Sequence, residues 1–219
     1  MCTRTVDRLA AEIAEPRLPA LIRRFLYDQL YPDNIFDSGH IPLNECPVIM
    51  GKVRVFNSAM ATFHAPSDPS GIKGMRREFI RCTDDWRKMG PRRDVTFLNR
   101  DPELPGLRGI DVVQIRLFFS FSREDTTYPC ALVHWFRILG DEPDGVTGMW
   151  VVQQEVDAEG KAVASVIHLD CIIRACHLVP VFGKRLLQSQ AMQPHDTLTA
   201  FKYYYVNKYA DHHANQLAF

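Results

Sequence analysis

The sequence lacks the features that would place the chain in a membrane or outside the cell. Its formal net charge is zero, so no overall charge directs it to nucleic acid or to a lipid surface. No apolar run reaches the ~18 to 20 residues that a membrane-spanning helix requires. The N-terminus carries acidic residues instead of the continuous apolar core of a secretory signal. We therefore expect a nuclear or cytoplasmic protein that is neither secreted nor bound to a membrane.

Motifs of well-known enzyme and metal sites are also missing. The six cysteines are scattered without a CxxC pair, which predicts reduced thiols that are buried as small hydrophobic side chains. The chain contains no GxSxG nucleophile motif, no GK[ST] phosphate loop and no HExxH zinc motif. The sequence thus leans against an enzyme and predicts no cofactor.

The stretch from Asp111 to Val152 carries the clearest structural signal. It holds two long apolar runs and a shorter third one, separated by the turn-rich segments at 122–129 and 140–148. Val, Ile, Phe and Trp are dense in these runs and suit a pleated, half-buried surface. We predict three antiparallel strands in the middle of a small, strongly bent β-sheet or barrel. The pattern loosely resembles chromatin-reader barrels of the bromo-adjacent-homology or tudor kind.

The remaining chain predicts an α+β fold in a single domain over residues 1–219. Apolar residues at helical spacing predict N-terminal helices over 5–32, which end at Pro32. A β-rich core is expected over 50–183, within which the segment 75–86 is interpreted as a short helix or turn. The aromatic tail predicts one C-terminal helix over 196–217.

A cluster of basic residues lies just before the central strands, with Phe79 and Trp86 among them. Guanidinium groups suit phosphate contacts, and aromatic faces can stack on bases. The segment therefore predicts a DNA- or RNA-binding surface, although a solvated face with locally paired charges would give the same pattern. The predicted contacts are Arg76, Arg77, Arg81, Arg87, Lys88, Arg92 and Arg93.

Aromatic residues on the predicted strands allow a second interpretation. In a small barrel, Tyr128, Trp135 and Trp150 could form a cage that holds a methylated lysine of a histone peptide through cation–π attraction. Alternation along a strand would instead send some of these rings into the core.

A set of His and Asp residues suggests a third interpretation. His168, Asp170, Asp211 and His212 have the donor atoms of a divalent metal site, which would fit a metal-dependent nuclease or hydrolase. The alternative is that Asp211 caps a turn and leaves the neighbouring histidines exposed.

Several long segments of the chain, taken together, resemble one family. The chain is similar to the C-terminal region of proteins encoded by Plavaka-type transposons of mushroom-forming fungi, which are relatives of CACTA-like DNA transposons. The segments that carry this resemblance are RLPALIRRFLYDQLYPD, NECPVIMG, FNSAMATFHAPSDPSGIKGMRREFIR, RGIDVVQIRLFFSF, YPCALVHWF, GDEPDGVTGMWVV, VIHLDCIIRACHLVPVFG and YYYVNKYADHHANQLAF.

The resemblance implies that a DDE-type catalytic core would lie upstream of the region compared. We therefore expect a non-catalytic accessory module that binds DNA or chromatin through the arginine-rich surface. Two alternatives stay open, namely the metal-dependent enzyme and a protein–protein or oligomerisation module that uses an apolar tail.

Overall fold

A long antiparallel hairpin forms the centre of the fold. The computed structural model describes residues 2–34, 36–66, 71–183 and 192–219, and its hairpin consists of β7 (Ile110–Arg123) and β8 (Thr126–Leu139). β9 (Val151–Gln154) pairs with the end of β8, so the three strands predicted over 111–152 are present. Val, Ile and Phe side chains fill β7, and most of them are buried.

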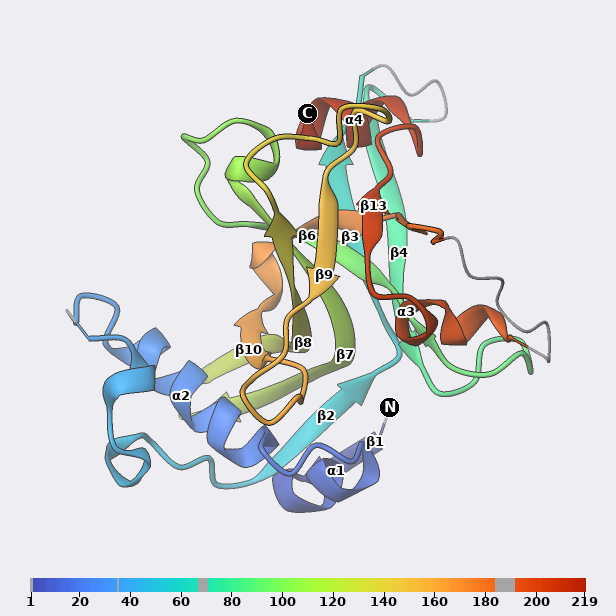
Figure 1. Cartoon of the computed structure of the whole chain (residues 1–219). Helices are drawn as coiled ribbons and strands as arrows, with labels where there is room; N and C mark the ends of the chain where they lie inside the picture. Colours follow the sequence, from blue (N-terminus) through green and yellow to red (C-terminus); the bar gives the residue numbers. More distant parts are fainter. Residues whose placement is uncertain (1, 35, 67–70, 184–191) are drawn as a thin grey trace.

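Each half of this hairpin has different neighbours, and the resulting antiparallel sheet curls strongly (Figure 1). The half that contains the β7–β8 turn is flanked by β2 (Lys52–Phe56), with β1 (Cys2–Thr5) beyond it, and by β10 (Ala164–His168). The other half is flanked by β6 (Val95–Asn99) with β11 (Ile172–Cys176), and by β9 with β13 (Tyr204–Val206) and β12 (Leu178–Pro180). This confirms the mixed α+β class and the strongly bent antiparallel sheet.

A β-bulge at Arg116 sits where the neighbours change. The register of β7 against β8 shifts between Ile115 and Leu117, so Arg116 is the extra residue. Because one extra residue reverses the alternation of side chains, Ile115 and Phe118 pack in the same hydrophobic cluster. On the opposite face, Gln114 and Arg116 separate two other clusters, and His134 lies opposite Gln114 on β8. The sheet therefore carries a polar gap between two apolar cores.

The N-terminal helices cover one end of the sheet, as predicted over 5–32 (Figure 1). α1 (Val6–Glu12) and α2 (Leu18–Leu30) bury Leu9, Leu18 and Leu26 against β2, β7 and β8. Within the described part of the chain, no helix is long and apolar enough to cross a bilayer. Short 3-10 helices complete the connections at Ser38–His40, Leu43–Glu45, Gly106–Arg108, Leu169–Cys171 and Pro194–Asp196.

A second, smaller sheet is formed by β3 (Ser58–His64), β4 (Met75–Thr83) and β5 (Arg92–Arg93). The short helix or turn predicted over 75–86 is wrong, because β4 is a regular strand with alternating burial. Phe79 points to solvent while Glu78 and Ile80 point inward. Because a charged residue faces inward and an aromatic residue faces outward, the sequence of β4 does not show the usual alternation of apolar and polar residues.

The single C-terminal helix predicted over 196–217 is also wrong. The structure has α3 (Thr197–Ala200), then strand β13, and then α4 (His212–Ala218). Tyr204 and Val206 are both buried on one side of β13, and aromatic and β-branched residues favour a strand. Asp211 caps α4, since its carboxylate accepts a hydrogen bond from the Ala214 N–H at 2.8 Å.

Candidate nucleic-acid interface

The outer face of the β3–β4 hairpin presents arginine and large apolar side chains to solvent. Alternation along β4 places Arg77, Phe79 and Arg81 on this face, and Phe79 is 55% exposed. Met60 of β3 lies directly opposite Phe79 in the antiparallel register and is also exposed. Exposed aromatic and apolar surface with polar or charged residues around it is typical of binding sites, so this face has the composition of a binding surface.

Trp86, just after β4, is surrounded by guanidinium groups. The carbon atoms of these groups lie 4.4 Å from the centre of the Trp86 ring for Arg81, 5.1 Å for Arg87 and 5.2 Å for Arg92. Arg81 also lies 5.7 Å from the ring of Phe79. Contacts of this kind hold the arginines over an aromatic surface. Arg92 also donates to Asp94, whereas Arg81 and Arg87 keep most of their N–H groups available to an anion.

A tight turn holds Trp86 in place. The Met89 N–H donates to the Trp86 carbonyl at 3.0 Å, and the Trp86 N–H donates to the Gly90 carbonyl at 2.8 Å. Arg87 and Lys88 both adopt positive φ, at 56° and 62°. Left-handed backbone costs a non-glycine residue roughly 1–2 kcal/mol. The turn therefore presents two cations at a cost in stability that Asn or Gly would avoid.

We predict that Gly90→Ala destabilises the protein by about 1–2 kcal/mol. Gly90 has φ +95°, and an added Cβ would lie 2.8 Å from the ring of His195. Thermal unfolding would measure the loss. Gly145→Ala is the matched control, because a Cβ there meets nothing within 4 Å. Equal stability of the two variants would contradict the prediction.

The seven predicted contacts differ in whether they form ion pairs and in which face of the hairpin they lie on. Arg77, Arg81, Arg87 and Lys88 make no ion pair with any residue that the structure describes. Arg92 pairs with Asp94 at 2.7 Å, and Arg93 pairs with Asp84. Arg76 is half-buried on the inner face of β4, opposite the buried Phe63. Arg77 and Arg81 thus lie on the outer face, and Arg87 and Lys88 lie in the turn that follows the strand.

A buried arginine network attaches this hairpin to the main sheet. Arg174 of β11 donates to both carboxylate oxygens of Asp211, at 2.8 and 2.6 Å, and to Glu78 of β4 at 3.4 Å. Its guanidinium also lies 4.7 Å from the centre of the Phe63 ring on β3. The inner face of the hairpin is therefore held against the main sheet by the contacts of Arg174, while its outer face is accessible to solvent.

The predicted metal set does not form a site. Both oxygens of Asp211 are occupied by Arg174, and one of them also caps α4. The ring nitrogen Nδ1 of His168 accepts a hydrogen bond from the Asp170 N–H at 3.3 Å. Throughout the described ranges, no three His, Cys, Asp or Glu side chains are grouped so that they could hold a metal ion. Within those ranges the four residues, His212 included, are thus not a metal site.

The predicted aromatic cage is not formed either. Tyr128 stacks on Phe121 at 5.2 Å in the cluster beneath the N-terminal helices. Trp135 packs in a different cluster and donates its indole N–H to Ser165 at 3.0 Å. Trp150 is buried in a third cluster. Strand alternation and the curl of the sheet separate the three rings, so they serve packing.

The described cysteines form no disulfide bonds with one another, and most of their thiols are packed in the interior. Cys46, Cys82, Cys130 and Cys176 are buried, and burial raises the pKa of the Cys82 thiol to about 11. This agrees with the prediction of buried, reduced cysteines.

The fold and this surface together describe a β-rich module with an arginine- and aromatic-lined outer face. Comparison with known proteins finds no matching protein family, no significantly similar curated protein and no significantly similar solved structure. The function is therefore argued from the geometry of the site.

Proposed function

We propose that the protein is a non-catalytic module that binds nucleic acid through the outer face of the β3–β4 hairpin and the Trp86 turn. The observation that carries the proposal is the group of three guanidiniums around Trp86, next to the exposed ring of Phe79. Arg92 is paired with Asp94, but Arg81 and Arg87 have no carboxylate partner among the described residues, and a phosphate placed between them would relieve their mutual repulsion.

The surface favours an unpaired strand over a duplex. Proteins bind single strands by combining a positive surface that follows the phosphates with aromatic rings on which bases stack. Phe79 and its neighbour Met60 offer an exposed apolar platform in the middle of the positive surface.

This function agrees with the resemblance to a transposon-encoded region, and we retain an accessory role in such a protein as part of the proposal. Oligomerisation through the C-terminal tail has less support. α4 packs its Ala214 and Ala218 side chains inward, and Ala218 is fully buried.

Removing Arg77, Arg81 and Arg87 together, each to alanine, tests the proposal. Fluorescence polarisation with a labelled single-stranded oligonucleotide would be measured across a salt series. We expect weaker binding and a salt dependence whose slope, log affinity against log salt, falls by about 2, since each lost phosphate contact contributes roughly 0.7. Phe79→Ala is expected to weaken binding by about 1–3 kcal/mol through lost stacking.

In a matched control, three exposed cations of the main sheet are each replaced by alanine, namely Lys52, Arg54 and Arg137. It changes the net charge by the same amount, so it should leave the affinity close to that of the wild type. Equal weakening in both triple variants would assign binding to net charge alone. The absence of any strand binding by the wild type would reject the proposed function.

A further inference from the structure

A cavity of about 660 Å³ opens behind the Trp86 turn, beside the polar gap in the main sheet. Its apolar lining includes Trp86, Met89 and Leu198, and its polar lining includes Arg93, Gln114 and Arg116. A cavity of this size suits a small organic ligand, and a mixture of apolar walls with a few polar groups is typical of such sites.

Two polar side chains in this cavity lack partners. The guanidinium of Arg116 makes no hydrogen bond or ion pair with the described residues, although the side chain is half-buried in the sheet. Gln114, two residues earlier on β7, is 7% exposed, and its amide likewise forms no hydrogen bond in the described part of the chain. Both side chains line the cavity, so their polar groups are available to hydrogen-bond with a ligand there.

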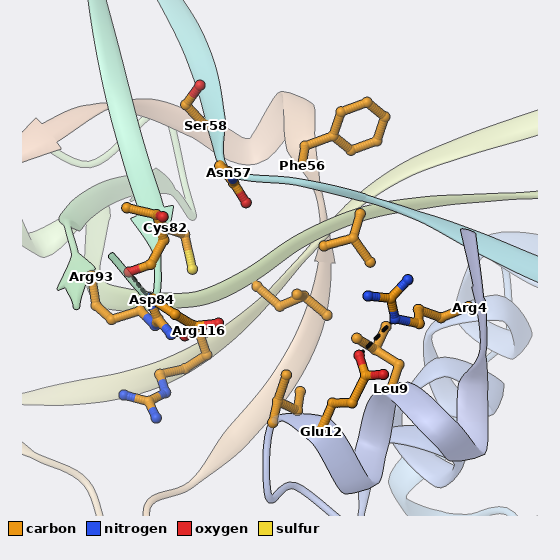
Figure 2. A pocket seen from close by; sticks show the side chains of 14 residues that line it. Arg4, Leu9, Glu12, Phe56, Asn57, Ser58, Cys82, Asp84, Arg93 and Arg116 are labelled. Atoms are coloured by element: carbon orange, nitrogen blue, oxygen red, sulfur yellow. Dashed lines mark hydrogen bonds and ion pairs between the residues drawn. The ribbon is translucent and has the colours of Figure 1, made fainter. Parts of the chain in front are cut away.

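Two arginines meet at the same place, and one of them, Arg93, pairs with Asp84. Arg93 and Arg116 line three adjoining cavities, of about 660, 480 and 240 Å³. Figure 2 shows them beside Asp84 at one end of the 480 Å³ cavity, with the Arg4–Glu12 ion pair at the other end. Burial, together with the charge of Arg93, lowers the pKa of Arg116, while Glu15 and Asp84 oppose this effect by smaller amounts. The fold thus holds a guanidinium where its charge is unfavourable, and a bound anion would offset that cost.

We propose that this cavity binds a nucleoside monophosphate, either as a free nucleotide or as the terminal nucleotide of a strand. The phosphate is held by Arg116 and Arg93, and the base lies among Trp86, Met89 and Leu198, with the Gln114 amide available for a hydrogen bond to its edge. Bidentate donation by a guanidinium matches the geometry of a phosphate. Since Arg116 and Gln114 are not part of the outer face, this site can fail or hold independently of the proposed strand binding.

Calorimetric titration of the full chain with adenosine 5′-monophosphate tests the site, with adenosine and inorganic phosphate as partial ligands. The wild type is expected to bind the nucleotide more tightly than either partial ligand. Arg116→Met should weaken nucleotide binding at least ~10-fold, and Gln114→Leu should weaken it to a smaller extent. Arg54→Met, at an exposed position on β2, is the control and should bind as the wild type does. No nucleotide binding, or equal binding by wild type and Arg116→Met, would overturn the proposal.

Stability measurements separate a ligand-binding role for Arg116 from a structural one. Because its charge is unpaired, Arg116→Met should raise the melting temperature of the ligand-free protein by about 2–4 °C. A decrease of that size would show that Arg116 supports the fold and would count against the site.

Oligonucleotides with and without a 5′-phosphate identify the source of the nucleotide. A preference for the phosphorylated strand that disappears in Arg116→Met assigns the cavity to a strand terminus. Equal binding of both strands, alongside retained binding of the mononucleotide, assigns it to a free nucleotide. The variant that lacks Arg77, Arg81 and Arg87 should lose strand affinity but keep mononucleotide binding, so the two proposals can be judged separately.

Discussion

Replacing Arg174 with methionine is expected to lower the free energy of unfolding by about 3 kcal/mol and the melting temperature by roughly 10 °C. Arg174 is 4% exposed, and its charge is balanced by Asp211 and Glu78. Methionine would fill much of the same volume but leave both carboxylates without their cation. The expected loss lies at the lower end for a broken buried ion pair, because Asp211 and Glu78 keep 24% and 17% of their side chains accessible.

The loss should extend beyond one ion pair, because Arg174 joins three elements. It connects β11 to α4 through Asp211, and it connects β11 to the hairpin through Glu78 and the ring of Phe63. His213 stacks on Phe63 at 4.7 Å and accepts a hydrogen bond from Arg174 through Nδ1 at 3.1 Å. Without Arg174 the hairpin is less firmly attached, so strand binding by its outer face should weaken as well.

A matched pair of variants checks this account. Arg137→Met removes an exposed arginine whose only side-chain hydrogen bond in the described structure, to Gln153, is 3.2 Å long. This replacement should change the free energy of unfolding by less than about 0.5 kcal/mol. Neutralising both carboxylates in the Arg174→Met background, with Glu78→Gln and Asp211→Asn, should recover part of the lost stability. If the triple variant is no more stable than Arg174→Met alone, unpaired charge is not the cause. Chemical denaturation monitored by circular dichroism would supply the free energies.

The same network should respond to strong acid. Burial raises the pKa of Asp211, but hydrogen bonds from Arg174 and from the Ala214 N–H lower it by more, so that the pKa is about 2. A carboxylate whose pKa is depressed by folding stabilises the protein above its unfolded value, near 4, and this contribution is lost as the pH falls towards 2. The loss should be absent in Asp211→Asn.

The sequence predicted the main sheet but not the hairpin that carries the proposed surface. In β7 and β8 many side chains are apolar and β-branched or aromatic, so the strand signal is local and visible. In β4 the inward residues include Arg76 and Glu78, while Phe79 points outward. Glu78 points inward, where Arg174, 96 residues later in the chain, neutralises it. A long-range partner of this kind leaves no trace in a local pattern.

The candidate site divides in the same way. The cations around Trp86 are close together in sequence, so composition alone predicted a basic surface there. The cavity residues Gln114 and Arg116 are visible only as polar interruptions of an apolar run. Their meaning depends on the bulge at Arg116, which changes the side that each residue faces, and a bulge cannot be deduced from side-chain type. The metal and cage predictions failed for a related reason. Their residues have suitable side chains for a metal site or an aromatic cage, but the fold does not bring those side chains together.

His134 should make the protein sensitive to mild acid. It lies in the polar gap on β8, where burial is the main cause that lowers its pKa, to about 4, with a further contribution from the charge of Arg116. Glu15 opposes this effect from 4.0 Å away, but its carboxylate is already bonded to Arg17. The folded protein therefore keeps His134 neutral at pH values where the unfolded chain is protonated.

The sign of the effect follows from proton uptake. Between the unfolded pKa near 6.5 and the folded value of about 4, the unfolded state binds a proton that the folded state excludes. Stability must then fall as the pH is lowered through this window. From pH 7 to pH 5 we expect His134 to account for a loss of about 2 kcal/mol in the free energy of unfolding.

Comparison of the wild type with His134→Gln isolates this contribution, because glutamine keeps a polar side chain in the gap but does not titrate. The variant should lose about 2 kcal/mol less than the wild type between pH 7 and pH 5 in denaturant titrations. Parallel curves for wild type and His134→Gln would mean that His134 takes up its proton in the folded state.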